Sequence, residues 1–209
     1  MVNRKISFVY FDVGGVAMLD FSGTNKWEKM KRDICLTDKN IALFDDIWEK
    51  HRDRIGIDFD VDALIPLLRQ EIGIKFPEDY SMLLDFVKRF EPNPSIWPVL
   101  EKIYRKYRIG LLTNMYSRMF NVLKTKGLIP NFDWDVIVDS SVVGFQKPDK
   151  KIFEIAQAKA GVSNEKILFV ENSSEHVQAA KALGWQTFLY DSANPLQSSQ
   201  NLLNFVSLF

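Results

Sequence analysis

Short apolar runs alternate with segments of helical periodicity over the second half of this sequence. Four such runs end in polar residues, at 107–115, 134–141, 166–174 and 186–192. The helical segments between them each end in a glycine, at Gly127, Gly161 and Gly184, and glycine is the residue that most often ends a helix. Alternating strands and helices are typical of a doubly wound parallel sheet, so we predict an α/β fold with residues 6–11 as its first strand.

Residues 17–94 follow a different pattern, because helical periodicity dominates them and strand-like alternation is missing. One apolar stripe at helical spacing contains Phe44, Ile47, Trp48 and His51. This stripe predicts a small helical bundle in which His51 is packed rather than ligating. The three prolines of residues 91–98 mark the point where the chain would leave the bundle. We therefore predict a helical domain at 17–94, inserted after the first strand of a core made of residues 1–16 and 95–209.

The composition excludes several classes of partner. The chain has 209 residues, 46% of them hydrophobic, and its 27 Lys plus Arg are balanced by 27 Asp plus Glu. A chain of this length can bury a core, and its zero net charge favours neither nucleic acid nor an anionic membrane surface. No apolar stretch has the length of a membrane span, and Asp12 interrupts the first apolar run too early for a secretory signal. Cys35 is the single cysteine, and we expect it to be buried in a protein of the reducing cytoplasm.

Polar residues end each predicted strand. In an open parallel sheet, ligands bind beyond the carboxyl ends of the strands, so these residues are candidates for one shared site. They are Asp12, Thr113, Asn114, Glu171 and Asn172, with Lys147 on the loop that follows the run at 134–141. Carboxylates, a hydroxyl and an ammonium group could thus meet in one crevice.

The first two of these segments resemble motifs of the haloacid dehalogenase-like hydrolase superfamily. "FDVGGV" is similar to the first motif, in which the leading aspartate, here Asp12, is the nucleophile and the backbone of Val13 and Gly14 approaches the phosphate. "LLTN" is similar to the second motif, with Thr113 contacting the transferred phosphoryl group and Asn114 often facing the substrate.

The third and fourth motifs follow in the same order. "VGFQKPDKKIFEIA" resembles the third, where Lys147 would neutralise charge on the phosphate and on the nucleophile. "LFVENSSEHVQAAKALGW" resembles the fourth, so that Mg²⁺ would be bound by Asp12, the Gly14 carbonyl, Glu171 and Asn172. The helical insertion is similar to the helical cap of sugar-phosphate phosphatases whose first motif reads "DLGNV". The resemblance implies a Rossmann-like core and a small phosphorylated metabolite as substrate.

Two positions depart from the pattern of the superfamily. Most of its phosphatases carry a second aspartate two residues after the nucleophile, as the acid that protonates the leaving group, and this chain has Gly14 there. Glu171 is followed by Asn172 where a second acid is common, which should weaken magnesium binding. We therefore expect a preference for aryl, acyl or anomeric phosphates, and we expect Gly14→Asp to raise turnover of poorer leaving groups. Asp20 and Glu28 are weak candidates for a replacement acid, and His176 is expected to lie on the surface.

Three functions remain open. The leading interpretation is a magnesium-dependent phosphatase that forms an aspartyl-phosphate intermediate. The second is a metal-independent 2-haloacid dehalogenase, against which Glu171 argues because an unpaired carboxylate would face an anionic substrate. The third is a noncatalytic protein that keeps the fold and binds a metabolite or a partner protein. The sequence does not indicate the substrate or the oligomeric state.

Overall fold

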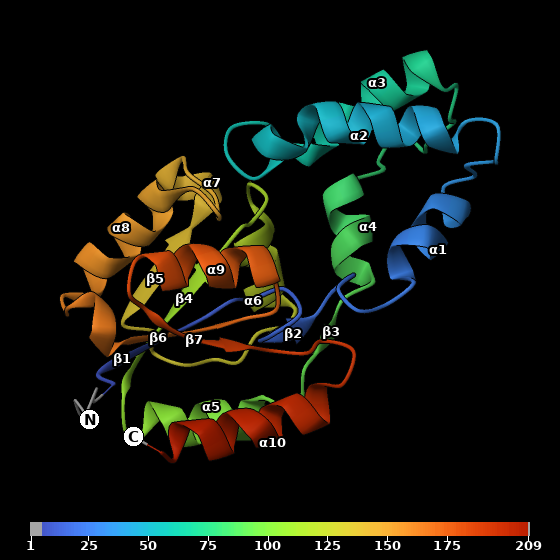
Figure 1. Ribbon diagram of the computed structural model, residues 1–209. Coiled ribbons are helices and arrows are strands. Elements are labelled where there is room, and N and C mark those ends of the chain that lie inside the picture. The colour runs from blue at the N-terminus through green and yellow to red at the C-terminus, as the bar shows by residue number, and fades with distance from the viewer. Residues whose placement is uncertain (1–5, 209) are drawn as a thin grey trace.

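A five-stranded parallel sheet forms the centre of the molecule (Figure 1). The structure, a computed structural model, describes residues 6–208. In spatial order the strands are β5 (Val136–Asp139), β4 (Arg108–Thr113), β1 (Phe8–Phe11), β6 (Ile167–Glu171) and β7 (Gln186–Leu189). The predicted doubly wound α/β fold is confirmed, with each strand inside the apolar run that predicted it.

β1 lies in the middle of the sheet and pairs in parallel with β4 on one side and β6 on the other. Its alternate side chains point to opposite faces, and all four residues of the strand are fully buried. This burial on both faces explains why the run is uniformly apolar rather than alternating. The chain leaves β1 between two neighbours that run in the same direction, so the carboxyl ends of β1, β4 and β6 meet at one edge.

Helices cover both faces of the sheet (Figure 1). α8 (Lys150–Ala160) and α9 (Ser174–Ala182) pack on the face of Phe8 and Tyr10, and α5 (Trp97–Tyr104), α6 (Met119–Thr125) and α10 (Pro195–Val206) pack on the other. The short helices α7 (Ser140–Val143) and η2 (Asn164–Lys166) complete the connections. α10 is the last helix of the described chain, and Leu208 beyond its end is 81% exposed.

The segment after β1 forms a separate layer of helices beyond the edge of the sheet (Figure 1). It consists of α1 (Lys26–Asp33), α2 (Ile41–Ile55), η1 (Val61–Ala63), α3 (Leu64–Glu71) and α4 (Met82–Lys88). Two short strands, β2 (Met18–Leu19) and β3 (Glu91–Pro92), pair antiparallel where the chain enters and leaves this layer. The division into a core of residues 1–16 and 95–209 and a cap of residues 17–94 stays a prediction.

The core of the helical layer is aromatic. Phe21, Trp27, Trp48 and Phe86 stack edge-on or tilted against one another. His51 is packed as predicted, with its Nδ1 2.8 Å from the Ile47 carbonyl oxygen and its ring tilted against a phenyl ring. The prediction for Cys35 is wrong, because this residue is exposed in the turn that ends α1, with a left-handed φ of 65°. No helix within residues 6–208 is long and apolar enough to cross a membrane.

Candidate active site

Asp12 is the first residue after β1, and its backbone continues the ladder by donating from N to the Val170 carbonyl at 2.9 Å. Its Oδ1 accepts a hydrogen bond from the Val13 amide at 2.8 Å and lies 2.9 Å from Lys147 Nζ. Its Oδ2 forms no hydrogen bond with any residue of the described chain. The side chain is 11% exposed, so this free oxygen is held in one orientation yet remains open to a small ligand.

Lys147 lies at the centre of the site. Its side chain is 1% exposed, and Nζ is 2.9 Å from Asp12 Oδ1 and 2.6 Å from Glu171 Oε2. Nζ also donates to the Leu112 carbonyl oxygen at 3.2 Å. An ammonium group has three hydrogens to donate, so these contacts use all of them. Asp12, Lys147 and Glu171 form the carboxylate–lysine cluster, whose buried charges sum to one negative charge.

Glu171 is fully buried at the end of β6, and both of its carboxylate oxygens have partners. Its Oε1 accepts hydrogen bonds from the amides of Asn172 and Ser173, each at 2.9 Å. Its Oε2 faces Lys147 Nζ and lies 3.2 Å from His176 Nδ1. A carboxylate offers about four lone-pair directions, so Glu171 would bind a metal only by giving up one of these contacts.

His176 is not an ordinary surface residue, and the sequence-based prediction for it is wrong. Its side chain is 17% exposed and faces the carboxylate of Glu171. Ser173 accepts a hydrogen bond from the His176 amide and begins α9 at the tip of β6. The first turn of this helix therefore lies against the site. The sequence could have indicated His176 by its place in the first turn of the helix that follows β6.

The two carboxylates of the cluster have opposite pKa shifts. Burial, reinforced by the negative charge of Glu171, raises the pKa of Asp12 to about 7 despite the opposing charge of Lys147. Burial acts on Glu171 in the same direction, but Lys147 and His176 outweigh it and hold its pKa at about 2. Above about pH 7 the extra negative charge of the cluster therefore rests on Asp12, the residue with the free oxygen.

Thr113 is the last residue of β4, and Asn114 is the first residue after it. Both ends of the Asn114 amide bind the backbone of Lys147: Nδ2 donates to its carbonyl oxygen at 2.8 Å, and Oδ1 accepts from its N–H at 2.7 Å. Asn114 thereby holds the loop that delivers the lysine, while it also lines the pocket. Thr113 is 1% exposed and ends β4 in register with Asp139. A contact from Thr113 to a phosphoryl group stays a prediction.

The two glycines after the nucleophile are packed closely by other side chains. A Cβ on Gly14 would overlap Oδ2 of Asp20, and a Cβ on Gly15 would overlap Nδ2 of Asn172. Gly15 also has a φ of 75°, which favours glycine, and Ser192 Oγ donates to its carbonyl oxygen at 2.7 Å. The space beside both glycines is thus occupied by polar side chains.

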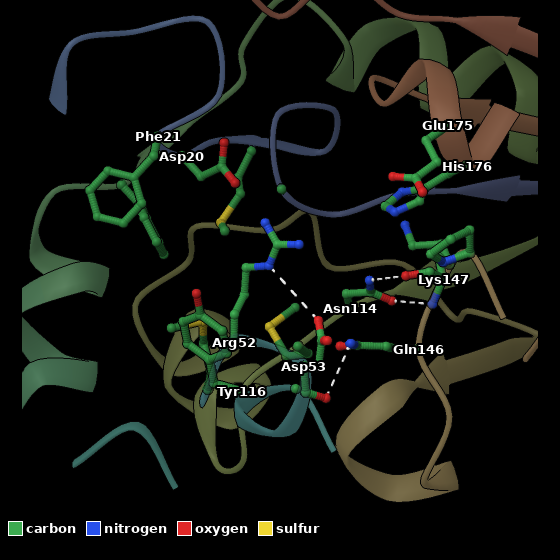
Figure 2. A pocket seen from close by; sticks show the side chains of 17 residues that line it. Asp20, Phe21, Arg52, Asp53, Asn114, Tyr116, Gln146, Lys147, Glu175 and His176 are labelled. Atoms are coloured by element: carbon green, nitrogen blue, oxygen red, sulfur yellow. Dashed lines mark hydrogen bonds and ion pairs between the residues drawn. The ribbon is translucent and has the colours of Figure 1, made fainter. Parts of the chain in front are cut away.

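A pocket of about 490 Å³ lies between the sheet edge and the helical layer. From the core it is lined by Gly14, Asn114, Gln146, Lys147 and His176, and from the cap by Asp20, Phe21, Arg52 and Asp53 among others. Figure 2 shows Asp20 and Phe21 on one side, Lys147, Glu175 and His176 on the other, and Arg52 and Asp53 between them. The sequence did not indicate the contribution of Arg52, Asp53 or Gln146.

Core and cap are joined at the rim of this pocket. Ser140 Oγ donates to the Gly56 carbonyl oxygen at 2.5 Å, and Gln146 Nε2 donates to the Asp53 carbonyl oxygen at 3.2 Å. Both acceptors lie at the end of α2. The cap therefore closes over the sheet edge through its backbone, and Arg52 and Asp53 are placed beside the pocket as a consequence.

The donor atoms near Asp12 suit a hard divalent cation. Among residues 6–208 no group of three or more His, Cys, Asp and Glu side chains is placed to hold a metal ion. Magnesium is commonly bound by one or two carboxylates together with waters and phosphate oxygens. The free Oδ2 and the uncompensated negative charge at Asp12 fit such an ion. The amide of Asn172, beyond Gly15, and the Gly14 carbonyl are the further oxygen donors predicted for it.

Comparison with known proteins identifies the family. The family model described as haloacid dehalogenase-like hydrolase matches residues 36–184, more than half of the sequence. The chain therefore belongs to the haloacid dehalogenase-like hydrolase family, as its four motifs indicated, and the protein is a hydrolase of this family. The helical-cap subgroup stays a prediction.

Curated relatives include enzymes of two kinds. Phosphatase MT3486 of Mycobacterium tuberculosis is 26% identical over 201 residues, which cover 90% of this chain and 88% of that protein. Haloacetate dehalogenase H-2 of Moraxella sp. is 30% identical over 100 residues, which cover 47% of this chain and 44% of that protein.

A solved structure shares the fold. It is an HAD family enzyme of Bacteroides thetaiotaomicron in complex with magnesium and inorganic phosphate. It has a TM-score of 0.70 at 18% identity and covers 90% of this chain and 95% of that one. At this level of identity the likeness concerns the fold alone.

Proposed function

We propose that this protein is a magnesium-dependent phosphatase of small phosphorylated metabolites. The observation that carries the proposal is the free Oδ2 of Asp12, whose other oxygen is fixed by Val13 and by Lys147, a residue that lines the pocket. Phosphatase MT3486, which is similar over most of both chains, supports this choice of reaction. The Bacteroides structure with magnesium and phosphate supports the choice of metal.

In the proposed reaction Asp12 Oδ2 attacks the phosphorus atom, and the ester oxygen leaves from the opposite side. Lys147 keeps Asp12 oriented and places positive charge next to the phosphoryl oxygens. Thr113, Asn114 and the backbone of Val13 and Gly14 are the predicted phosphate contacts. Water then hydrolyses the aspartyl-phosphate and releases inorganic phosphate.

A magnesium ion would be held by Asp12, the Gly14 carbonyl and Asn172, with Glu171 as the fourth predicted ligand. When bound, it would supply positive charge for the phosphoryl oxygens. Glu171 in its present contacts acts through Lys147, because it fixes the ammonium group that faces Asp12. Of Asp12, the Gly14 carbonyl and Asn172, only Asp12 carries a charge. We therefore expect magnesium to bind weakly.

The experiment is hydrolysis of 4-nitrophenyl phosphate, measured with magnesium and with a chelator. Asp12→Asn should lower turnover on the order of 10⁴-fold or more, since loss of a nucleophile removes the covalent route. Asp139→Asn is the matched control, because Asp139 also ends a strand but caps α7, and asparagine caps equally well. Activity that survives in Asp12→Asn, or that ignores the chelator, contradicts the proposal.

A metal-independent dehalogenase is the second candidate, and one observation favours it. Glu171 is not the unpaired carboxylate that would repel an anionic substrate, because its oxygens contact Lys147, His176 and two backbone amides. Haloacetate dehalogenase H-2 is a relative over part of the chain. Release of halide from chloroacetate by chelator-treated protein, with no phosphatase activity, would replace the first proposal by this one.

A further inference from the structure

The carboxyl group of Asp20 occupies the space beside Gly14. A Cβ built on Gly14 would overlap Oδ2 of Asp20 and come within 3.2 Å of its Cγ. Gly14 follows the proposed nucleophile Asp12 by two residues, so their Cα atoms are at most about 7 Å apart. The carboxyl of Asp20 therefore lies next to the turn predicted to bind phosphate, although Asp20 itself is eight positions from Asp12.

Local structure holds this carboxyl in place. Asp20 directly follows β2, and Gly14 forms a β-bridge with Met18 of that strand. Oδ1 of Asp20 accepts a hydrogen bond from the Ser22 amide at 2.8 Å. Oδ2 is the oxygen on the Gly14 side. The hydrogen bond from Ser22 thus anchors the carboxyl group at the wall of the pocket that Asp20 lines.

The other ionisable groups of the pocket are less suited to act on a leaving group. The side chain of Asp53 is 85% exposed, and Glu175 is also exposed. The His176 imidazole lies on the opposite wall, beside the carboxylate–lysine cluster (Figure 2). The Tyr116 phenol is a weak acid, ordinarily with a pKa of about 10. Asp20 is the half-buried carboxyl group that faces the cavity across from Lys147.

We infer that Asp20 protonates the leaving group in the proposed phosphatase reaction. As Asp12 Oδ2 bonds to phosphorus, the bond from phosphorus to the ester oxygen breaks, and that oxygen keeps the bonding pair and takes the proton of Asp20. Water then attacks the aspartyl-phosphate, its proton passes to Asp20, and Asp12 is released with inorganic phosphate. The inference rests on the proposed function and assigns a proton donor to it.

This assignment changes two expectations drawn from Gly14. The protein should also hydrolyse alkyl phosphates, because Asp20 protonates their poor leaving group. Gly14→Asp alone should not help, since its side chain would collide with the Asp20 carboxyl. Glu28, the other candidate, does not line the pocket and is paired with Lys31 at 3.2 Å.

The test compares one good and one poor leaving group, 4-nitrophenyl phosphate and glycerol phosphate, in the full-length protein with magnesium. Asp20→Asn keeps the shape of the side chain and should lower kcat/KM for glycerol phosphate by about 10²- to 10⁴-fold, the range for positioned acid catalysis. The loss for 4-nitrophenyl phosphate should stay below about tenfold, because nitrophenolate leaves without a proton. Asp53→Asn, the control at another carboxyl of the pocket, should show no such difference between the esters.

A double variant keeps the test independent of folding effects at residue 20. Gly14→Asp with Asp20→Ala moves the carboxyl to the other backbone position, and it should recover glycerol phosphate turnover relative to Asp20→Ala alone. Equal losses on both esters in Asp20→Asn, or a selective loss in His176→Asn instead, would overturn the role of Asp20 while leaving the phosphatase intact. No magnesium-dependent turnover of either ester by the unaltered protein would overturn the proposed function and this assignment together.

Discussion

Replacing Asp12 by asparagine should stabilise the protein at alkaline pH. The carboxylate–lysine cluster contains two carboxylates and one ammonium group, all buried. Asp12→Asn reduces its charge from minus one to zero and keeps an oxygen to accept from Val13 and Lys147. The variant that abolishes the proposed activity is thus expected to fold more tightly than the natural chain.

The magnitude follows from the pKa of Asp12, which burial and Glu171 raise from 3.8 to about 7. A carboxyl group with a higher pKa in the folded state contributes stability that is fully present below about pH 4 and lost as the pH rises through about 7. A shift of about three pKa units lowers the free energy of unfolding by about 4 kcal/mol at pH 8, relative to low pH. At pH 5 the loss is less than half of that. Because the two carboxylates share Lys147, about 2 to 4 kcal/mol is expected for Asp12→Asn at pH 8.

Glu171→Gln should act in the opposite direction. The pKa of Glu171 is held at about 2, below its usual 4.5, mainly through Lys147 against the effect of burial. Such a group contributes stability above about pH 4.5 that is lost as the pH falls through about 2. Its removal should cost about 1 to 3 kcal/mol at pH 8, part of the loss being offset because the pKa of Asp12 then falls.

The assay is urea unfolding of the natural chain and both variants at pH 8 and pH 5, with a chelator present so that no metal neutralises Asp12. The stability gained in Asp12→Asn should shrink by more than half between pH 8 and pH 5. A variant less stable than the natural chain at pH 8, or a gain equal at both pH values, would refute the charge assignment within the cluster.

Three further variants test separate contacts. Lys147→Met leaves two buried carboxylates without their cation and should cost about 3 to 5 kcal/mol at pH 8 together with all turnover, whereas a loss below about 1 kcal/mol in urea unfolding would contradict the cluster. Gly15→Ala should lower the free energy of unfolding by at least about 1 kcal/mol more than Gly144→Ala does. Both residues have a left-handed φ (75° and 76°), but only a Cβ at residue 15 would meet other side chains. Equal melting temperatures of the two variants would show that the packing of Asn172 is loose. Asn172→Asp adds a charged donor and should lower the magnesium concentration for half-maximal activity, and an unchanged titration would remove Asn172 from the metal site.

Much of the fold is visible in the sequence because its signals are local. β1 and β6 are buried on both faces, so their residues form continuous apolar runs that differ clearly from the helical spacing of α8 or α9. The glycines that close helices have positive φ, as at Gly127 and Gly161, for a reason that depends only on neighbouring residues. The convergence of strand ends follows from parallel pairing, so Asp12, Lys147 and Glu171 could be predicted to meet.

The sequence does not indicate contacts between residues that are distant in the chain. Gly14 reads as a missing acid until the structure shows that the side chain of Asp20 fills the adjacent space. Glu171 stays a predicted metal ligand, but only the structure shows that Lys147, His176 and two amides contact its oxygens. Cys35 reads as a buried residue from its type, and only the turn after α1 places it in solvent.

The sequence by itself determined the order of strands and helices along the chain, the inserted helical layer and the polar residues at the strand ends. These follow from periodicity and backbone conformation, which act over a few residues. The tertiary structure decided which carboxylate carries the unpaired charge, which oxygens remain free and which cap residues line the pocket. Those properties depend on burial and on distances of a few ångströms between side chains from different elements, because electrostatic energies in a buried site change steeply with both.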